Sequence, residues 1–203
     1  MKTAFFGGTF DPVHTGHLAL AREVLKQGRA DRILFVPAPV PPHKEMRNIS
    51  AFEHRFAMVE LAIAGEPGFA CSDIEKHRSG KSYTIDTLTE LAAIGTYGEI
   101  LLLIGSDSLR QLHLWYHAHE LVERFGLIVY PRRDEPVTAA ELGRHWSEAE
   151  CAKLQAALMV SAPEFPLSST QIREIIKKNG VEGVSSFVIP PVAEYITSHG
   201  LYH

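Results

Sequence analysis

The residues with the clearest chemical potential lie near the N-terminus, in the segment GGTFDPVHTGH that spans residues 7–17. Its glycine pair lets the backbone approach a phosphate closely, and a helix that starts near Thr15 presents unpaired N–H groups and a positive dipole end. His14 and His17 can both face that anion and donate hydrogen bonds to it, because they are three residues apart at the helix start. Gly16 leaves room between them. The segment therefore predicts a phosphate site.

Two other interpretations of this segment remain open on the residues alone. A glycine pair after a strand is often only a turn, and two histidines three residues apart are often a surface pair. A zinc site would need a third ligand of defined identity, and the segment lacks the HExxH pattern in which a general base lies between two ligands. We therefore predict no metal ligation by His14 and His17.

A second phosphate site is predicted in the segment LSSTQIR, residues 167–173. Ser168 can cap the helix that follows, and the remaining donors can hold an outer phosphate of a nucleotide beside the guanidinium of Arg173. The alternative is an ordinary N-cap without a ligand, because serines are common before helices.

Taken whole, GGTFDPVHTGH resembles the signature of the HxGH nucleotidyltransferase superfamily, and LSSTQIR resembles its second signature, ISSTxIR, with a conservative leucine at the first position. In that family the two histidines stabilise the phosphates of ATP while a substrate phosphate attacks the α-phosphorus in line and releases pyrophosphate. The resemblance implies that His14 and His17 are the catalytic residues. Such chemistry needs positioning and charge stabilisation more than a protein nucleophile. The residues that the resemblance assigns to ATP are Gly7, Gly8, Thr9, Phe10, Gly16, Gly105, Asp107, Ser168, Ser169 and Arg173.

Three further segments narrow the second substrate, again by resemblance. PPHK (residues 41–44), SYT (82–84) and the pair Trp115-Tyr116 resemble segments of bacterial nicotinate mononucleotide adenylyltransferases, and the likeness reaches from Phe6 to Tyr202. It implies that Trp115 stacks on the pyridine ring and that backbone amides near Thr84 and Tyr116 receive the nicotinate carboxylate. The residues so assigned to the substrate are His43, Lys44, Tyr83, Thr84, Trp115 and Tyr116.

Each of these residues also has a structural interpretation without the resemblance. Lys44 could belong to a solvated basic loop, Trp115 to the core, and Tyr83 with Thr84 to a helix start. Asp107 could cap a helix after Gly105. Relatives that adenylylate phosphopantetheine carry threonine in place of His14 and are shorter. No role is assigned to the histidines at 113, 117 and 119 or to the segment 132–155.

The elements that must position these residues follow from hydrophobic periodicity. Short apolar runs bounded by turn residues predict strands at 3–6, 33–36, 69–71, 100–104, 127–130 and 158–160. Helical spacing predicts helices after His17, Ser82, Trp115 and Ser168, and from Pro191. Capping boxes predict two further helix starts, at Ser50 to Glu53 and at Thr138 to Glu141, the first with an apolar face of Phe56, Val59, Leu61 and Ile63.

This alternation predicts an α/β fold, a doubly wound Rossmann-like parallel sheet with helices on both faces and a C-terminal helical elaboration. Ligands then bind beyond the carboxyl ends of the strands. At 203 residues the chain is predicted to form a single nucleotidyltransferase domain, residues 1–203.

Composition excludes several partner classes. The net charge of −4 offers no electrostatic footprint for nucleic acid, and no apolar run is long enough to span a membrane. Cys71 and Cys151 are too few for a disulfide framework and fit a reducing cytoplasm.

We therefore predict an enzyme that transfers the adenylyl group of ATP to nicotinate mononucleotide, giving deamido-NAD and pyrophosphate, with Mg²⁺ accompanying ATP. The alternatives are an adenylyltransferase of the same fold that prefers nicotinamide mononucleotide and a nucleotide-binding regulator without turnover. The sequence leaves open whether the chain forms a homo-oligomer.

Overall fold

The computed structural model describes residues 1–39, 49–76, 78, 82–132 and 136–203. Within these residues, parallel strands form one sheet in the order β3-β2-β1-β4-β5. The strands are β1 (Lys2–Gly8), β2 (Arg32–Pro37), β3 (Phe69–Cys71), β4 (Glu99–Gly105) and β5 (Gly126–Tyr130). The chain runs outward from β1 to β3, then crosses back to place β4 on the other side of β1.

Both faces of this sheet are buried, which explains why its strands read as continuous apolar runs. In β1, Ala4 and Phe6 join one hydrophobic cluster, whereas Phe5 joins the other. The same alternation places Phe35 and Leu34 of β2 in opposite clusters. Side chains of successive strand residues point to opposite faces, so each face needs its own cover of helices.

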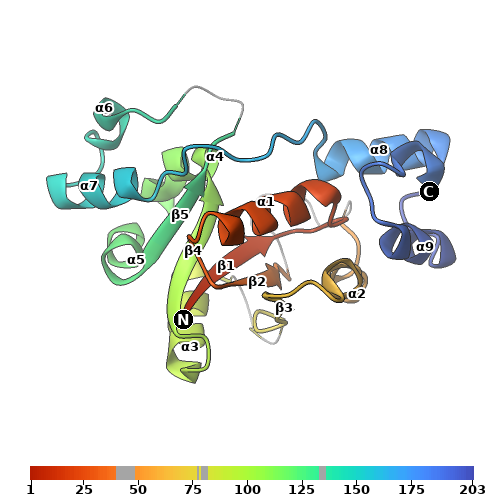
Figure 1. Cartoon of the computed structure of the whole chain (residues 1–203), viewed down its shortest axis with the longest axis horizontal. Helices are drawn as coiled ribbons and strands as arrows, with labels where there is room; N and C mark the ends of the chain where they lie inside the picture. The colour runs from red at the N-terminus through yellow and green to blue at the C-terminus, as the bar shows by residue number, and fades with distance from the viewer. Residues whose placement is uncertain (40–48, 77, 79–81, 133–135) are drawn as a thin grey trace.

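The helices divide between the two faces as a doubly wound fold requires. The first cluster contains residues of α1 (Thr15–Lys26), α2 (Phe52–Ile63), α8 (Ser169–Asn179) and α9 (Pro190–Ser198). The second contains residues of α3 (Thr84–Ile94), α4 (Ser106–Gln111), α5 (Ala118–Arg124), α6 (Ala139–Leu142) and α7 (Glu148–Ala156). Two short 3₁₀ helices, η2 (Leu112–Leu114) and η3 (Val181–Val184), lie among the described residues. Figure 1 shows α8 and α9 at one end of the molecule and α6 and α7 at the other.

Of the two predicted capping boxes, the one at Thr138 is confirmed and the one at Ser50 is wrong, while the predicted N-cap at Ser168 is also confirmed. Ser168 and Thr138 cap α8 and α6, each accepting a hydrogen bond from the backbone N–H three residues on. Helix α2 instead begins at Phe52, after an N-cap residue without a side-chain bond. The backbone of Ser50 is engaged elsewhere: its N–H donates to Asp11 Oδ2 at 3.2 Å, and its carbonyl accepts from Arg55 Nε at 2.9 Å.

The buried face of α2 also differs from the predicted one. Arg55, Met58 and Val59 are buried, whereas Phe56 is only half-buried. Periodicity of apolar residues cannot place a buried arginine, because such a residue is inside only when its charge and donors find partners.

The strand predicted at 158–160 is wrong as well. Leu158 forms a single parallel bridge with Val129, and Met159 N–H donates to Val129 O at 2.8 Å. The chain then leaves the sheet, and Val160 is fully exposed. A short apolar segment forms only an isolated β-bridge, and not a strand, when a single residue of it pairs with the adjacent strand.

The order of the strands reverses between β1 and β4, which is where open α/β sheets bind ligands. The carboxyl ends of these two neighbours are Gly8 and Gly105, and the turns that follow carry the predicted phosphate-binding residues. In the described part of the chain, no helix has both the length and the apolar surface that crossing a membrane requires.

Candidate active site

A cleft of about 850 Å³ opens beside β1 and α1. Most of the predicted catalytic and ATP-binding residues line it: Gly7, Gly8, Thr9, Phe10, His14, Gly16, His17, Asp107, Ser168 and Ser169. The structure thus brings together two segments about 150 residues apart in the chain, together with the turn after β4. A volume of several hundred Å³ is typical of a small-molecule site.

The two histidines lie together at the start of α1. His14 is the N-cap residue, in an extended conformation, and its backbone N–H donates to His17 Nδ1 at 3.2 Å. The two imidazole rings stack with their centroids 3.7 Å apart. Because Nδ1 of His17 accepts a hydrogen bond, the proton of the neutral ring resides on Nε2, which is then a donor for a ligand.

Both imidazoles are held neutral. Burial, reinforced by the positive charge of Arg132, lowers the pKa of His14 to about 3. Burial, the coupling to the neighbouring ionisable ring of His14 and the positive charge of Arg132 lower the pKa of His17 well below its usual value. Nδ1 of His14 is buried without a hydrogen-bond partner among the described residues. The pair therefore offers hydrogen-bonding groups to a ligand without carrying charge of its own at neutral pH.

An aromatic side chain that sequence reasoning missed covers His14. Phe165 stacks on the imidazole with centroids 4.4 Å apart and planes 5° apart, and it lines the cleft. A Cβ on Gly16 would lie 2.3 Å from Cγ of Phe165, so the glycine is needed for this close packing. Nothing in the sequence around Phe165, an isolated phenylalanine in a proline-containing segment, indicates that it stacks on a histidine about 150 residues away in the chain.

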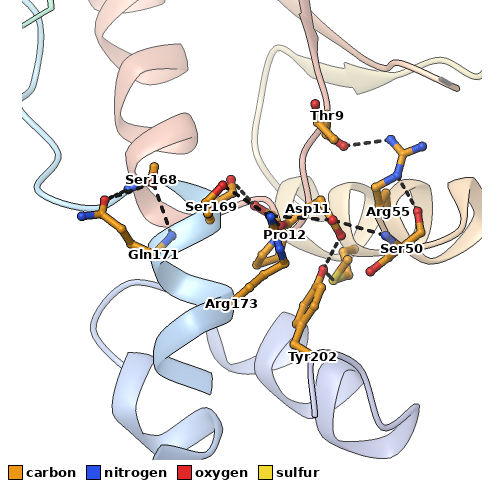
Figure 2. A network of polar contacts seen from close by, with 12 residues as sticks. Thr9, Asp11, Pro12, Ser50, Arg55, Ser168, Ser169, Gln171, Arg173 and Tyr202 are labelled. Carbon is orange, nitrogen blue, oxygen red and sulfur yellow. Dashed lines mark hydrogen bonds and ion pairs between the residues drawn. The ribbon is translucent and has the colours of Figure 1, made fainter. Parts of the chain in front are cut away.

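The second segment contacts the first directly. Ser168 caps α8, and its N–H donates to Gln171 Oε1 at 2.8 Å. Ser169 Oγ donates to the carbonyl of Pro12 at 3.0 Å (Figure 2). The start of α8 is therefore capped and also lies against the histidine-bearing loop, and its predicted contact with phosphate stays a prediction.

Arg173 contacts the loop between β1 and α1. Its Nη1 donates to the carbonyl of Asp11 at 2.7 Å and lies 3.8 Å from Oδ2 of that residue (Figure 2). Arg173 is not among the lining residues of the cleft. In this arrangement its guanidinium supports the loop, and its predicted contact with ATP stays a prediction.

A different arginine lines the cleft. Arg132 follows β5, and its Nε lies 3.3 Å from Oδ1 of Asp107. Its Nη2 donates to the hydroxyl of Tyr130 at 3.0 Å. A Cβ on Gly105 would lie 2.4 Å from Asp107 Oδ1 and 2.9 Å from Arg132 Nε, so the glycine leaves space for this ion pair. A cation just after a strand of the predicted sheet was the signal that could have identified Arg132.

The described residues predicted to bind the pyridine substrate do not line this cleft. Tyr83 is the N-cap residue of α3 and Thr84 its first residue, as the structural interpretation expected. The rings of Tyr83 and Tyr116 lie 4.3 Å apart. Trp115 is half-buried and packs against the second hydrophobic cluster. The predicted contacts of His43 and Lys44 lie outside the described residues.

Comparison with known proteins identifies the family. Residues 5–175 match the cytidylyltransferase-like family. A protein of Caldicellulosiruptor saccharolyticus named probable nicotinate-nucleotide adenylyltransferase is 39% identical, over 100% of this chain and 99% of the relative. A protein of the same name from Synechococcus sp. (strain JA-2-3B'a(2-13)) is 43% identical, over 99% and 96%. The chain belongs to the nicotinate-nucleotide adenylyltransferase family.

The fold agrees with solved structures of similarly named proteins. The nicotinic acid mononucleotide adenylyltransferase of Plasmodium falciparum, complexed with NaAD, has a TM-score of 0.77 at 18% identity, covering 99% of this chain and 97% of that one. A putative nicotinate-nucleotide adenylyltransferase of Vibrio parahaemolyticus has a TM-score of 0.66 at 22% identity, covering 99% and 94%. These likenesses show that this member of the family has the same Rossmann-like fold.

The described side chains of this adenylyltransferase do not fit a protein-held metal centre. Among them, no group of three or more His, Cys, Asp or Glu side chains is placed to hold a metal ion. The carboxylates that line the cleft are those of Asp107 and Glu164, and the first is paired with Arg132.

Proposed function

We propose that this enzyme transfers the adenylyl group of ATP to nicotinate mononucleotide, giving deamido-NAD and pyrophosphate, in the cleft that His14 and His17 line. One observation carries the proposal: both phosphate-binding signatures border a single cleft at the reversal point of the sheet, in a chain about 40% identical over its full length to proteins named for this activity.

The histidines act as fixed hydrogen-bond donors in this proposal. A phosphate of nicotinate mononucleotide attacks the α-phosphorus of ATP in line, and the bond to the β-phosphate breaks as pyrophosphate leaves. Neutral imidazoles that are already stacked and oriented can stabilise the developing phosphate charge without reorganising. No protein nucleophile is needed, because orientation and electrostatic stabilisation supply most of the catalysis in such reactions.

Arg132 supplies positive charge to the site. The histidines are neutral, and Arg132 lines the cleft whereas Arg173 does not, so Arg132 is the cation that the described lining of the cleft offers to the triphosphate. It exchanges its contact with Asp107 for a phosphate oxygen, which leaves the carboxylate of Asp107 to accept a hydrogen bond from the ribose.

Residues 1–203 form one nucleotidyltransferase domain, and Trp115 with the amides near Thr84 and Tyr116 binds the nicotinate ring. Mg²⁺ enters with ATP. The enzyme is placed in the cytoplasm, where the two free cysteines, Cys71 and Cys151, stay reduced.

The test is a pyrophosphate-release assay with ATP, Mg²⁺ and one of three acceptors: nicotinate mononucleotide, nicotinamide mononucleotide or phosphopantetheine. We expect the fastest release with the first. Faster release with the second would assign the enzyme to the amide substrate, and no release with any of them would favour a nucleotide-binding regulator.

The role of Arg132 is tested in the same assay. Arg132→Met should raise the KM for ATP about tenfold, because a charge-assisted contact with phosphate is lost. Arg144→Met, an exposed residue outside the cleft, is the matched control and should behave as the wild type. An unchanged KM in the Arg132 variant would remove this residue from the triphosphate site.

A further inference from the structure

Two charged side chains buried behind the cleft have no part in the chemistry proposed above. Asp11 and Arg55 are each 1% exposed. A buried charge is costly unless it is paired and hydrogen-bonded, so both residues must be well satisfied to be retained in the fold. Their partners converge on the loop between β1 and α1.

Three separate segments satisfy the carboxylate of Asp11. Tyr202 Oη donates to Oδ1 at 2.7 Å, and the backbone N–H of Ser50 donates to Oδ2 at 3.2 Å. Arg173 Nη1 lies 3.8 Å from Oδ2 and also donates to the carbonyl of Asp11. Figure 2 shows these groups gathered around Asp11 from the C-terminus, from α8 and from the chain before α2.

Arg55 holds the same loop from another side. Its Nη1 donates to the carbonyl of Thr9 at 2.8 Å, its Nη2 to Pro39 O at 3.1 Å and its Nε to Ser50 O at 2.9 Å. A guanidinium can serve three carbonyls at once because its donors diverge in one rigid plane. The arginine thereby ties the carboxyl ends of β1 and β2 to the start of α2.

The backbone carries an independent sign of constraint. Phe10, between Thr9 and Asp11, has φ +48°, and Tyr202 has φ +69°. Residues with a side chain are rarely left-handed, and such conformations persist where their surroundings over-determine them, often at functional sites. Of these two left-handed residues, Tyr202 belongs to the network around Asp11 and Phe10 is its neighbour in sequence.

We propose that Arg55 and Tyr202 are positioning residues, which fix residues 9–12 from behind and thereby hold His14 and His17 in register with the bound phosphates. Neither side chain lines the cleft. This inference rests on the proposed function for its kinetic test, but the ordering of the loop can be measured without turnover.

The hydroxyl of Tyr202 is suited to this task. Burial and the charge of Asp11 raise the pKa of Tyr202, so the hydroxyl remains a donor throughout the neutral range. Asp11 lies three residues before His14, so a displacement of its carboxylate is transmitted along a short piece of backbone. A misplacement of about 1 Å at reacting groups can cost about a hundredfold in rate.

The test compares Tyr202→Phe with Tyr195→Phe. Tyr195 lies on α9, is also half-buried and contacts His54 Nδ1 through its hydroxyl at 3.1 Å, outside the network around Asp11. Each change removes one hydroxyl from the C-terminal part of the chain. We expect Tyr202→Phe to lower kcat about tenfold with the KM values for both substrates within about twofold, and Tyr195→Phe to leave kcat within about twofold. Equal kcat values in the two variants would overturn the proposal.

Hydrogen exchange of the amides of residues 9–11 and 13 provides the second measurement. Loss of the Tyr202 hydroxyl should speed their exchange about tenfold at a temperature where all variants are folded, whereas the Tyr195 variant should match the wild type. If wild-type protein releases no pyrophosphate, the proposed function fails, while exchange still tests the positioning role. Unchanged exchange in Tyr202→Phe would contradict that role by itself.

Arg55→Lys tests the other half of the network. Lysine keeps the charge but lacks the planar fork, so it cannot serve three carbonyls in the same geometry. We expect kcat to fall at least tenfold in a protein whose circular dichroism is that of the wild type. If Arg55→Lys does not fold, the Tyr202 comparison decides the proposal alone. A folded Arg55→Lys variant with wild-type kcat would remove Arg55 from it.

Discussion

Acidification below pH 6.5 should destabilise the ligand-free enzyme through His14 and His17. The pKa values of both residues are depressed in the folded chain, to about 3 for His14. An unfolded histidine has a pKa of about 6.5, so between these values the unfolded chain binds protons that the folded chain excludes. Stability is therefore unaffected by this pair above pH 6.5 and is lost as the pH falls below it.

The magnitude follows from the number of excluded protons. Each histidine that is charged unfolded and neutral folded contributes about 1.4 kcal/mol of lost stability per pH unit. His14 and His17 together therefore account for about 2.7 kcal/mol per pH unit once the unfolded chain is fully protonated, between about pH 5.5 and pH 4.5. This is a large share of the stability of a typical domain, about 5–15 kcal/mol.

Urea unfolding at several pH values measures this slope. His17→Gln should lower the slope of the unfolding free energy against pH by about 1.4 kcal/mol per unit, because one excluded proton is removed. His203→Gln, at the exposed C-terminus, is the matched control. Carboxylates titrate in the same range, so the difference between variants is the quantity to compare. Parallel slopes in the two variants would show that His17 is not held neutral by the fold, and the electrostatic account of the site would then be wrong.

Three further predictions concern the cleft and the pyridine substrate. His17→Ala should lower kcat by about a hundredfold to a thousandfold in a folded protein, measured by pyrophosphate release, and near-normal kcat would end its assignment as catalytic. Gly16→Ala should lower kcat at least about tenfold, because its new Cβ would lie 2.3 Å from Phe165. An active variant with an unchanged affinity for ATP would mean that the close packing of Gly16 against Phe165 is not needed. Trp115→Ala should weaken the binding of both pyridine mononucleotides about tenfold or more yet keep the preference for nicotinate, because the ring face stacks on acid and amide alike. If the kcat/KM values for the two substrates became nearly equal, Trp115 would instead orient the carboxylate.

Local features were predictable from the sequence because they depend on neighbouring residues. Continuous apolar runs indicated strands buried on both faces, and the sequence around the two histidines indicated the helix start at which His14 and His17 lie. The cap of α8 at Ser168 follows from the hydrogen bond between its side chain and a backbone group three residues on. The predicted capping box at Ser50 failed because residues elsewhere in the fold bind its backbone: Asp11 accepts from its N–H, and Arg55 donates to its carbonyl.

Only the tertiary structure decided which side chains meet at the site. Arg173 reaches Asp11 across 162 residues of sequence and Tyr202 reaches it across 191, so no spacing rule could pair them. The same holds for Phe165 over His14, and for the arginine that faces the cleft, which is Arg132 rather than the one in the second signature. A motif indicates which groups can bind a phosphate. The orientation of each side chain is set by long-range packing, because a buried charge or ring takes the position in which its hydrogen-bond partners and close contacts are satisfied.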